Sequence, residues 1–142
     1  MLEICNHTQK VIDTQILFEI SQAMSVQDVE LLFVDLAQMQ QLNYEYRHKN
    51  TPTDVLSFPL DSFDQDFMPL GSIVICIPIA EEMATLYHHS LAEEIALLFI
   101  HGMLHLLGFD HEKDNGEHRL EEEQWIRRFR LPESLIVRTY KQ

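Results

Sequence analysis

The sequence predicts an α+β domain in which one mixed β-sheet of about four strands packs against helices. Short β-prone runs alternate with helical patterns through the first half of the chain, two more strand-like runs follow, and the remainder reads as helical. The length of 142 residues suits one domain with its own hydrophobic core. Residues 1–142 are therefore predicted to form a single domain.

The predicted strands are apolar runs rich in Val and Ile. They are LEIC, VELLFV at residues 29–34, TDVLSF and GSIVICI, with the turn-forming stretch PLDSFDQDFMPLG between the last two. VIDTQILFEISQAM has helical spacing, and LAQMQQLNYEYR predicts a second helix with Asp35 as its N-cap. The order of the strands in the sheet does not follow from the sequence.

From Pro78 onward the chain reads as helical, and a proline is tolerated in a first helical turn. Ser90 and Glu93 form the S-x-x-E capping box that begins the clearest helix. Its residues IALLFIHGMLHLL are apolar nearly all round, which is typical of a helix buried at the centre of a protein.

Two local signals end this helix and begin the last one. Gly108 is a helix stop, because glycine readily adopts the left-handed conformation found after a helix. Asp114 with Glu117 repeats the capping pattern and predicts a last helix through Trp125 and Phe129.

Composition favours a globular protein that is soluble and not exported. Apolar residues make up 46% and charged residues 23% of the chain, far from the composition of disordered chains. The first residues lack the pattern of a secretory signal, and the apolar runs are interrupted before they reach the length of a membrane span. Cys5 and Cys76 lie in apolar stretches and are predicted to be buried free thiols.

A formal net charge of −13 argues against nucleic-acid binding, which normally draws on a basic surface. Its distribution is uneven, because acidic residues crowd residues 61–66 and 121–123 while basic residues gather near the C-terminus. Such runs are more often solvated faces than binding sites.

The pattern H-x-x-x-H-x-x-G-x-x-H predicts a metal site. His101 and His105 lie about 40° apart around the predicted helix, and a turn at Gly108 lets His111 fold back toward them. Three imidazoles without a fourth protein ligand are typical of a catalytic zinc, whose open position holds a water made acidic by the metal. The alternative is that the histidines are satisfied core residues.

This pattern shares its ligands and glycine with the metzincin protease motif H-E-x-x-H-x-x-G-x-x-H. Gly102 stands where that motif has its general-base glutamate. A peptidase of that kind would therefore lack its general base. It would also lack the group that protonates the amine leaving group.

Other polar residues leave alternatives open. Arg47 could brace a phosphate near the metal or be a surface arginine at a helix end. Asp54 could be a turn former or a partner of a ligand imidazole, and the turn is favoured. Glu94 is on the face of His101 but also suits the start of a helix by its charge. An exposed or capping position is predicted for His48, His88 and His89, and no role is assigned to His7 and His118.

Three segments resemble the YbeY family of bacterial endoribonucleases and ribosomal RNA maturation factors. HGMLHLLGFDHE is similar to the metal motif of that family, QLNYEYRHKNTPTDVLSFPL to its conserved-arginine and strand segment, and LGSIVIC to the strand that follows. The resemblance covers the chain from about residue 29 to the last helix. Two positions depart from the family, since Ser72 replaces an acidic residue and Phe109 replaces a tyrosine.

The resemblance implies a cytoplasmic enzyme with zinc on His101, His105 and His111 and with Arg47 in the active cleft. It implies single-strand-directed cleavage in 16S ribosomal RNA maturation and ribosome quality control. The expected partners are ribosomal RNA and the small ribosomal subunit, and neither a membrane nor DNA is expected. Ser72 leaves the role of the usual carboxylate open.

The residues by themselves leave two other functions open. A metallopeptidase or small-molecule metallohydrolase is favoured by the metzincin-like pattern and the acidic composition. The non-enzymatic alternative is a ribosome-assembly factor whose zinc only stabilises the fold.

Overall fold

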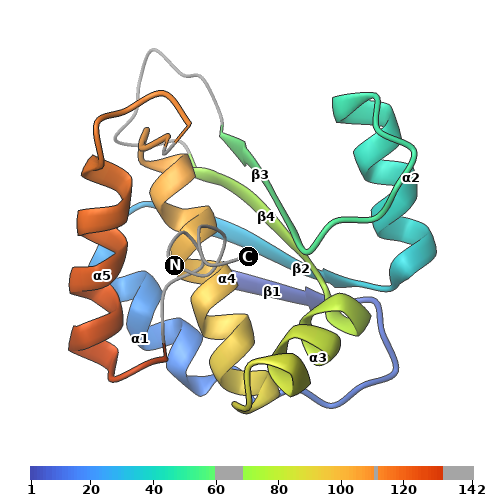
Figure 1. Cartoon of the computed structure of the whole chain (residues 1–142), viewed down its shortest axis with the longest axis horizontal. Helices are drawn as coiled ribbons and strands as arrows, with labels where there is room; N and C mark the ends of the chain where they lie inside the picture. Colours follow the sequence, from blue (N-terminus) through green and yellow to red (C-terminus); the bar gives the residue numbers. More distant parts are fainter. Residues whose placement is uncertain (60–68, 111, 133–142) are drawn as a thin grey trace.

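The computed structural model describes residues 1–59, 69–110 and 112–132 of the chain (Figure 1). Its elements are β1 Leu2–Asn6, α1 Gln15–Met24, β2 Val29–Val34, α2 Leu36–Arg47, β3 Val55–Pro59, β4 Gly71–Cys76, α3 Ile77–Leu86, α4 Leu91–Leu106 and α5 Glu117–Phe129. The predicted α+β class with one mixed sheet of four strands is confirmed.

The strands lie in the order β1-β2-β4-β3. β1, β2 and β4 are parallel, whereas β3 runs antiparallel to β4 with Leu56 opposite Val74. β3 is therefore an edge strand, and one side of it is open to a cleft described below. The parallel pairs join segments far apart in the chain, which is why local patterns did not predict the order.

The sheet is covered on both faces. Ile73 and Ile75 of β4 belong to the main core with α1, α4 and α5, whereas Val74 and Cys76 point to a second core that includes Met39 of α2. This alternation follows from the two-residue period of a strand. Figure 1 shows α2 on one side of the sheet and α1, α4 and α5 on the other.

α4 is the central helix of the main core, as predicted. The side chain of Ser90 accepts a hydrogen bond from the backbone of Glu93, whose side chain accepts one in return, so the capping box is formed. Gly102 lies close to the sheet, since an added Cβ would stand 3.0 Å from Ile73 Cγ2 and 3.1 Å from Ser57 Oγ. Among the described residues, no helix has both the length and the apolar character of a membrane span.

One prediction is confirmed at the end of α4, and one is wrong at the start of α5. Gly108 has φ +99° and follows Leu107, the C-cap of α4, as the stop signal predicted. Asp114 is not the N-cap of α5, because Gly116 holds that place. The Asp114 carboxylate instead accepts hydrogen bonds from the backbone N–H groups of Gly116 (2.9 Å) and His118 (2.9 Å). The Asp114 side chain thus supports the start of the helix from two residues before the N-cap.

The prediction for the two cysteines is half wrong. Cys76 is buried, and burial raises the pKa of its thiol. Cys5 is exposed, because it lies on the edge strand β1, and its Sγ is 3.5 Å from His7 Nε2.

Candidate metal centre and cleft

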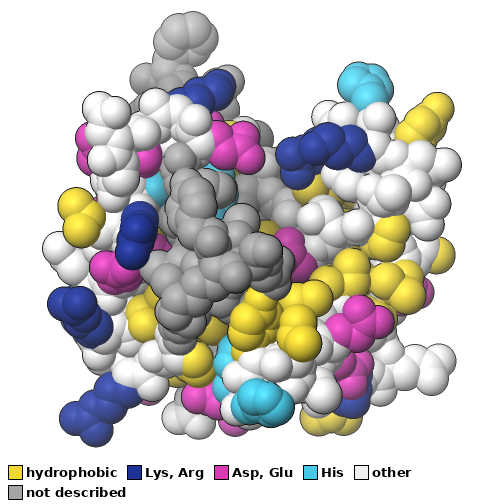
Figure 2. Space-filling model, viewed as in Figure 1, with side chains coloured by type: hydrophobic (Ala, Val, Ile, Leu, Met, Phe, Trp, Pro, Cys, Tyr) yellow, Lys and Arg dark blue, Asp and Glu magenta, His cyan; other side chains and the backbone are white. Residues whose placement is uncertain are grey.

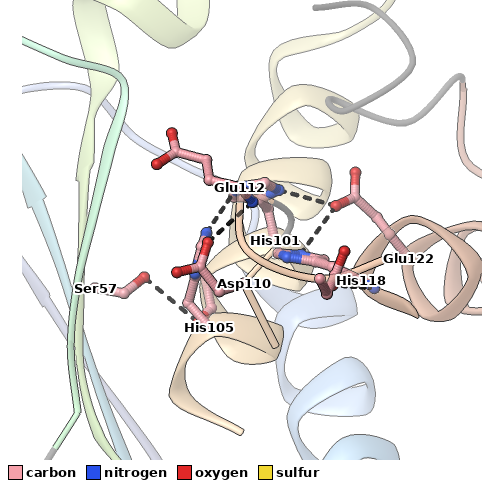
Figure 3. A network of polar contacts seen from close by, with 9 residues as sticks. Ser57, His101, His105, Asp110, Glu112, His118 and Glu122 are labelled. Atoms are coloured by element: carbon pink, nitrogen blue, oxygen red, sulfur yellow. Dashed lines mark hydrogen bonds and ion pairs between the residues drawn. The ribbon is translucent and has the colours of Figure 1, made fainter. Parts of the chain in front are cut away.

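His101 and His105 lie one turn apart on α4, and their rings converge (Figure 3). Their Nε2 atoms are 3.1 Å apart. Two nitrogens that bind one tetrahedral zinc at 2.0–2.1 Å are separated by about 3.3 Å. The pair therefore has the spacing that a shared metal ion requires.

Glu122 of α5 fixes the orientation of His101. Its Oε2 lies 2.8 Å from His101 Nδ1, and its side chain is fully buried. Burial by itself raises the pKa of Glu122, but hydrogen bonds from His101 and His118 and the coulombic attraction of these rings in their protonated form outweigh it and lower the pKa from 4.5 to about 2. The carboxylate is ionised at neutral pH and can only accept, so His101 Nδ1 donates the hydrogen bond. The lone pair of neutral His101 then lies on Nε2, toward His105.

His118 joins this group, although the sequence interpretation assigned it no role. Its Nε2 lies 3.4 Å from Glu122 Oε2, and its ring stacks on that of His101 at a centroid distance of 4.7 Å. The possible ligand atoms of His101, His105 and His118 all lie within 4.8 Å of one another. The missed signal was the i, i+4 pair of His118 and Glu122 on the otherwise apolar stripe of the last helix.

The third predicted ligand, His111, lies outside the described residues. The two residues beside it in the chain, Asp110 and Glu112, both line the same cleft as His101 and His105. Asp110 and Glu112 therefore share a cleft with His101 and His105, and the assignment of His111 as a ligand stays a prediction.

The histidine pair opens into a cleft of about 600 Å³. The cleft is bounded by the end of α2, the edge strand β3, the end of α4 and the segment that follows α4. Its described lining residues are Tyr46, Arg47, Thr53, Asp54, Val55, Leu56, Ser57, Phe58, Pro59, His101, His105, Asp110 and Glu112. In Figure 2, basic side chains over α2 lie across from acidic side chains.

The structure brings Arg47 to this cleft, together with the two histidines from α4. Arg47 is the last residue of α2 and is exposed. Among the lining residues that the structure describes, it is the only Arg or Lys, whereas Asp54, Asp110 and Glu112 are acidic. The cleft is therefore acidic unless a cation is bound between the histidines.

Two other polar residues from the sequence analysis have contacts in the structure. The carboxylate of Asp54 accepts a hydrogen bond from the Val55 backbone at 2.8 Å, which supports the turn role, although the residue also lines the cleft. Glu94 contacts His89 at 2.6 Å, and this buried pair joins the start of α4 to the preceding turn.

Ser72, which departs from the family pattern, lies outside the described lining of the cleft. Its hydroxyl is 3.3 Å from Glu30 Oε2 on the neighbouring strand. Gly102, where a metzincin has glutamate, packs so closely against Ile73 and Ser57 that a Cβ added there would crowd both side chains.

Comparisons with known proteins agree with this architecture. The family model described as Endoribonuclease YbeY matches residues 2–127. A relative named Endoribonuclease YbeY from Aliarcobacter butzleri is 52% identical over 138 residues, which cover 97% of this chain and 99% of the relative. One of the same name from Campylobacter jejuni is 57% identical over 120 residues, which cover 84% and 88%.

A solution structure from Thermotoga maritima matches with a TM-score of 0.61 and 27% identity over 92% of each chain. The fold, the family model and the relatives therefore agree over nearly the whole chain. The chain belongs to the Endoribonuclease YbeY family of hydrolytic nucleases.

Proposed function

We propose that residues 1–142 act as one domain that uses zinc to cut single-stranded ribosomal RNA. The proposed role is 16S ribosomal RNA maturation and ribosome quality control, on the small ribosomal subunit in the cytoplasm. One observation carries the catalytic part of the proposal. A histidine pair oriented by a buried carboxylate opens into the same cleft as an exposed arginine. The name of the matching family supports RNA as the substrate.

We assign zinc to His101, His105 and His111. The 3.1 Å separation of the first two Nε2 atoms supports a tetrahedral ion, and neutral imidazoles are ligands that zinc accepts readily. Bound zinc supplies a Lewis acid that lowers the pKa of a coordinated water and polarises a phosphoryl oxygen. Glu122 holds His101 in the tautomer that directs its lone pair at the ion.

His118 is proposed to support the buried side of this centre without binding the metal. Its Nε2 faces the carboxylate that also binds His101, and the two rings are stacked with an interplanar angle of 30°. A ring nitrogen that donates to the ionised Glu122 carboxylate is not available as a metal ligand, and Nε2 of His118 lies 3.4 Å from Glu122 Oε2. We therefore assign His118 to the support of His101 and Glu122.

Arg47 is proposed to bind the phosphate that is cut. A guanidinium offers planar, paired donors that match phosphate oxygens, and it stabilises negative charge that develops during phosphoryl transfer. Its place at the end of α2 leaves it accessible to substrate from solvent. Because the neighbouring carboxylates repel phosphate, RNA binding should need the metal as well as Arg47.

A metallopeptidase is the second candidate, because one feature favours it. β3 is an edge strand beside the histidine pair, and an extended peptide could pair with such an edge. The lack of a carboxylate at position 102 speaks against the metzincin mechanism.

The deciding experiment gives the purified zinc-loaded protein two substrates, a labelled 16S ribosomal RNA precursor and casein. We expect cleavage of the RNA, no cleavage of casein, and loss of the RNA activity in His105→Ala. Cleavage of casein alone would replace the nuclease with a peptidase. Equal RNA cleavage by His105→Ala would assign the activity to a contaminant.

A further inference from the structure

We propose that Tyr46 is a stacking platform for one RNA base at the mouth of the cleft, next to the phosphate held by Arg47. This inference rests on the proposed nuclease function and adds a substrate-binding residue to it. The ligand is an unpaired nucleobase of single-stranded RNA, whose flat face is available because it is not stacked within a duplex.

Tyr46 has the position and exposure that such a platform needs. It lines the cleft together with His101 and His105, and it is 62% exposed. It directly precedes Arg47 in the last turn of α2. A base on Tyr46 and a phosphate on Arg47 would then belong to the same stretch of RNA.

Phe58 of β3 holds the tyrosine ring in place. The two ring centroids lie 5.1 Å apart with an interplanar angle of 62°, an edge-to-face contact between α2 and the edge strand. Such a contact restrains the orientation of the ring while most of the residue remains exposed. A ring restrained before binding loses little conformational entropy when a base stacks on it.

The charge of the protein makes an uncharged contact necessary. Single-strand nucleases commonly combine a basic groove with aromatic side chains. This chain has a net charge of −13, and the described lining of its cleft contains one arginine against three carboxylates. Counterion release therefore contributes little affinity, and stacking, which depends weakly on net charge, must contribute a larger share.

Tyr44 provides a matched control on the same helix. It is 57% exposed, close to the value for Tyr46, but it is absent from the described lining of the cleft. Loss of an exposed tyrosine as such is therefore tested by Tyr44→Leu, and loss of the cleft tyrosine by Tyr46→Leu.

The experiment uses short single-stranded RNAs, one intact and the others with a single abasic site at successive positions. KM is measured under conditions in which cleavage is slow compared with RNA dissociation, so that it reports affinity, and Kd is measured by fluorescence anisotropy where the RNA is not cut. For the zinc-loaded wild type we expect an abasic site at one position to weaken affinity on the order of 10-fold. Tyr46→Leu should weaken binding of intact RNA by a similar factor and be insensitive to an abasic site at that position.

Two further measurements separate stacking from a structural role. Tyr46→Phe should keep the affinity of the wild type, because the ring is retained, and Tyr44→Leu should also keep it. The loss in Tyr46→Leu should persist when salt is raised, because no counterion is involved, and zinc content should stay unchanged.

Unchanged affinity in Tyr46→Leu, or equal loss at every abasic position, would overturn the stacking site. If the wild type cuts RNA but no single abasic site weakens its affinity, the stacking site is overturned and the nuclease is not. A wild type that shows the position but cuts no RNA would keep the stacking site and overturn the proposed nuclease.

Discussion

Glu122 Oε2 lies 2.8 Å from His101 Nδ1 and joins the last helix to the predicted metal ligand on α4. The contact is fully buried on the carboxylate side and bridges 21 positions of the chain. It therefore sets the direction of the His101 ring through the packing of α4 against α5, rather than through the helix that carries the histidine.

Glu122→Gln should weaken zinc binding about 10-fold or more, because the amide is a poorer and less polarising acceptor for the His101 N–H. Competition with a chromophoric chelator measures the affinity. Glu123→Gln is the matched control, since Glu123 pairs with Arg119 on the surface of the same helix at 3.3 Å. Equal zinc affinity in Glu122→Gln and the wild type would limit Glu122 to packing.

Zinc content should show whether His111 or His118 is the third zinc ligand. We expect about one zinc per chain in the wild type and loss of most of it in His101→Ala, His105→Ala and His111→Ala, because two remaining imidazoles hold zinc poorly. His118→Leu should retain the ion. Elemental analysis after gel filtration decides. Zinc retained in His111→Ala and lost in His118→Leu would make His118 the third ligand.

Arg47→Glu should abolish RNA cleavage while zinc content is unchanged, because the carboxylate repels the phosphate that the guanidinium binds. Stability should fall by about 1 kcal/mol or less, since an acidic residue at a helix C-terminus opposes the helix dipole. Arg47→Lys should recover part of the activity, because it keeps the charge but not the paired donors.

Cleavage rate at fixed low salt, melting temperature and zinc content are measured on the same samples. Arg47→Gln serves as the neutral control for the charge reversal. Undiminished cleavage by Arg47→Glu would remove Arg47 from the site, and lost zinc would make its role structural.

Gly102→Glu, which restores the protease motif on paper, should destabilise the protein and produce no peptidase. A Cβ at this position meets Ile73 and Ser57 at 3.0–3.1 Å, and a glutamate there would be buried against the sheet. Gly102→Ala should already cost about 1–3 kcal/mol through overpacking, partly offset by the better helix propensity of alanine. Thermal melts and casein assays check both variants. A stable Gly102→Glu protein that digests casein would show that α4 can move away from β4.

Local signals in the sequence predicted the elements well. The capping box at Ser90 and the stop at Gly108 depend on neighbouring residues, so their patterns were sufficient. The period of β4 likewise reflects which residues face each core. At Asp114 the same pattern misled, because an aspartate can cap from outside the helix as well as at its N-cap.

Contacts between distant segments were not predictable in this way. The approach of His101 and His105 follows from helix geometry, but the contact with Glu122 needs α4 and α5 to pack together. The exposure of Cys5 depends on β1 being an edge strand, and the sheet order was not available from local patterns.

RNA cleavage after metal removal tests the central claim most directly. The protein is stripped with a chelator, and the cleavage rate of one labelled single-stranded RNA is measured before and after zinc is restored, with circular dichroism on each sample. We predict a loss of at least about 100-fold without metal, retained helical dichroism, and recovery with zinc. Full cleavage by the metal-free, folded protein would contradict a zinc-dependent nuclease at this site.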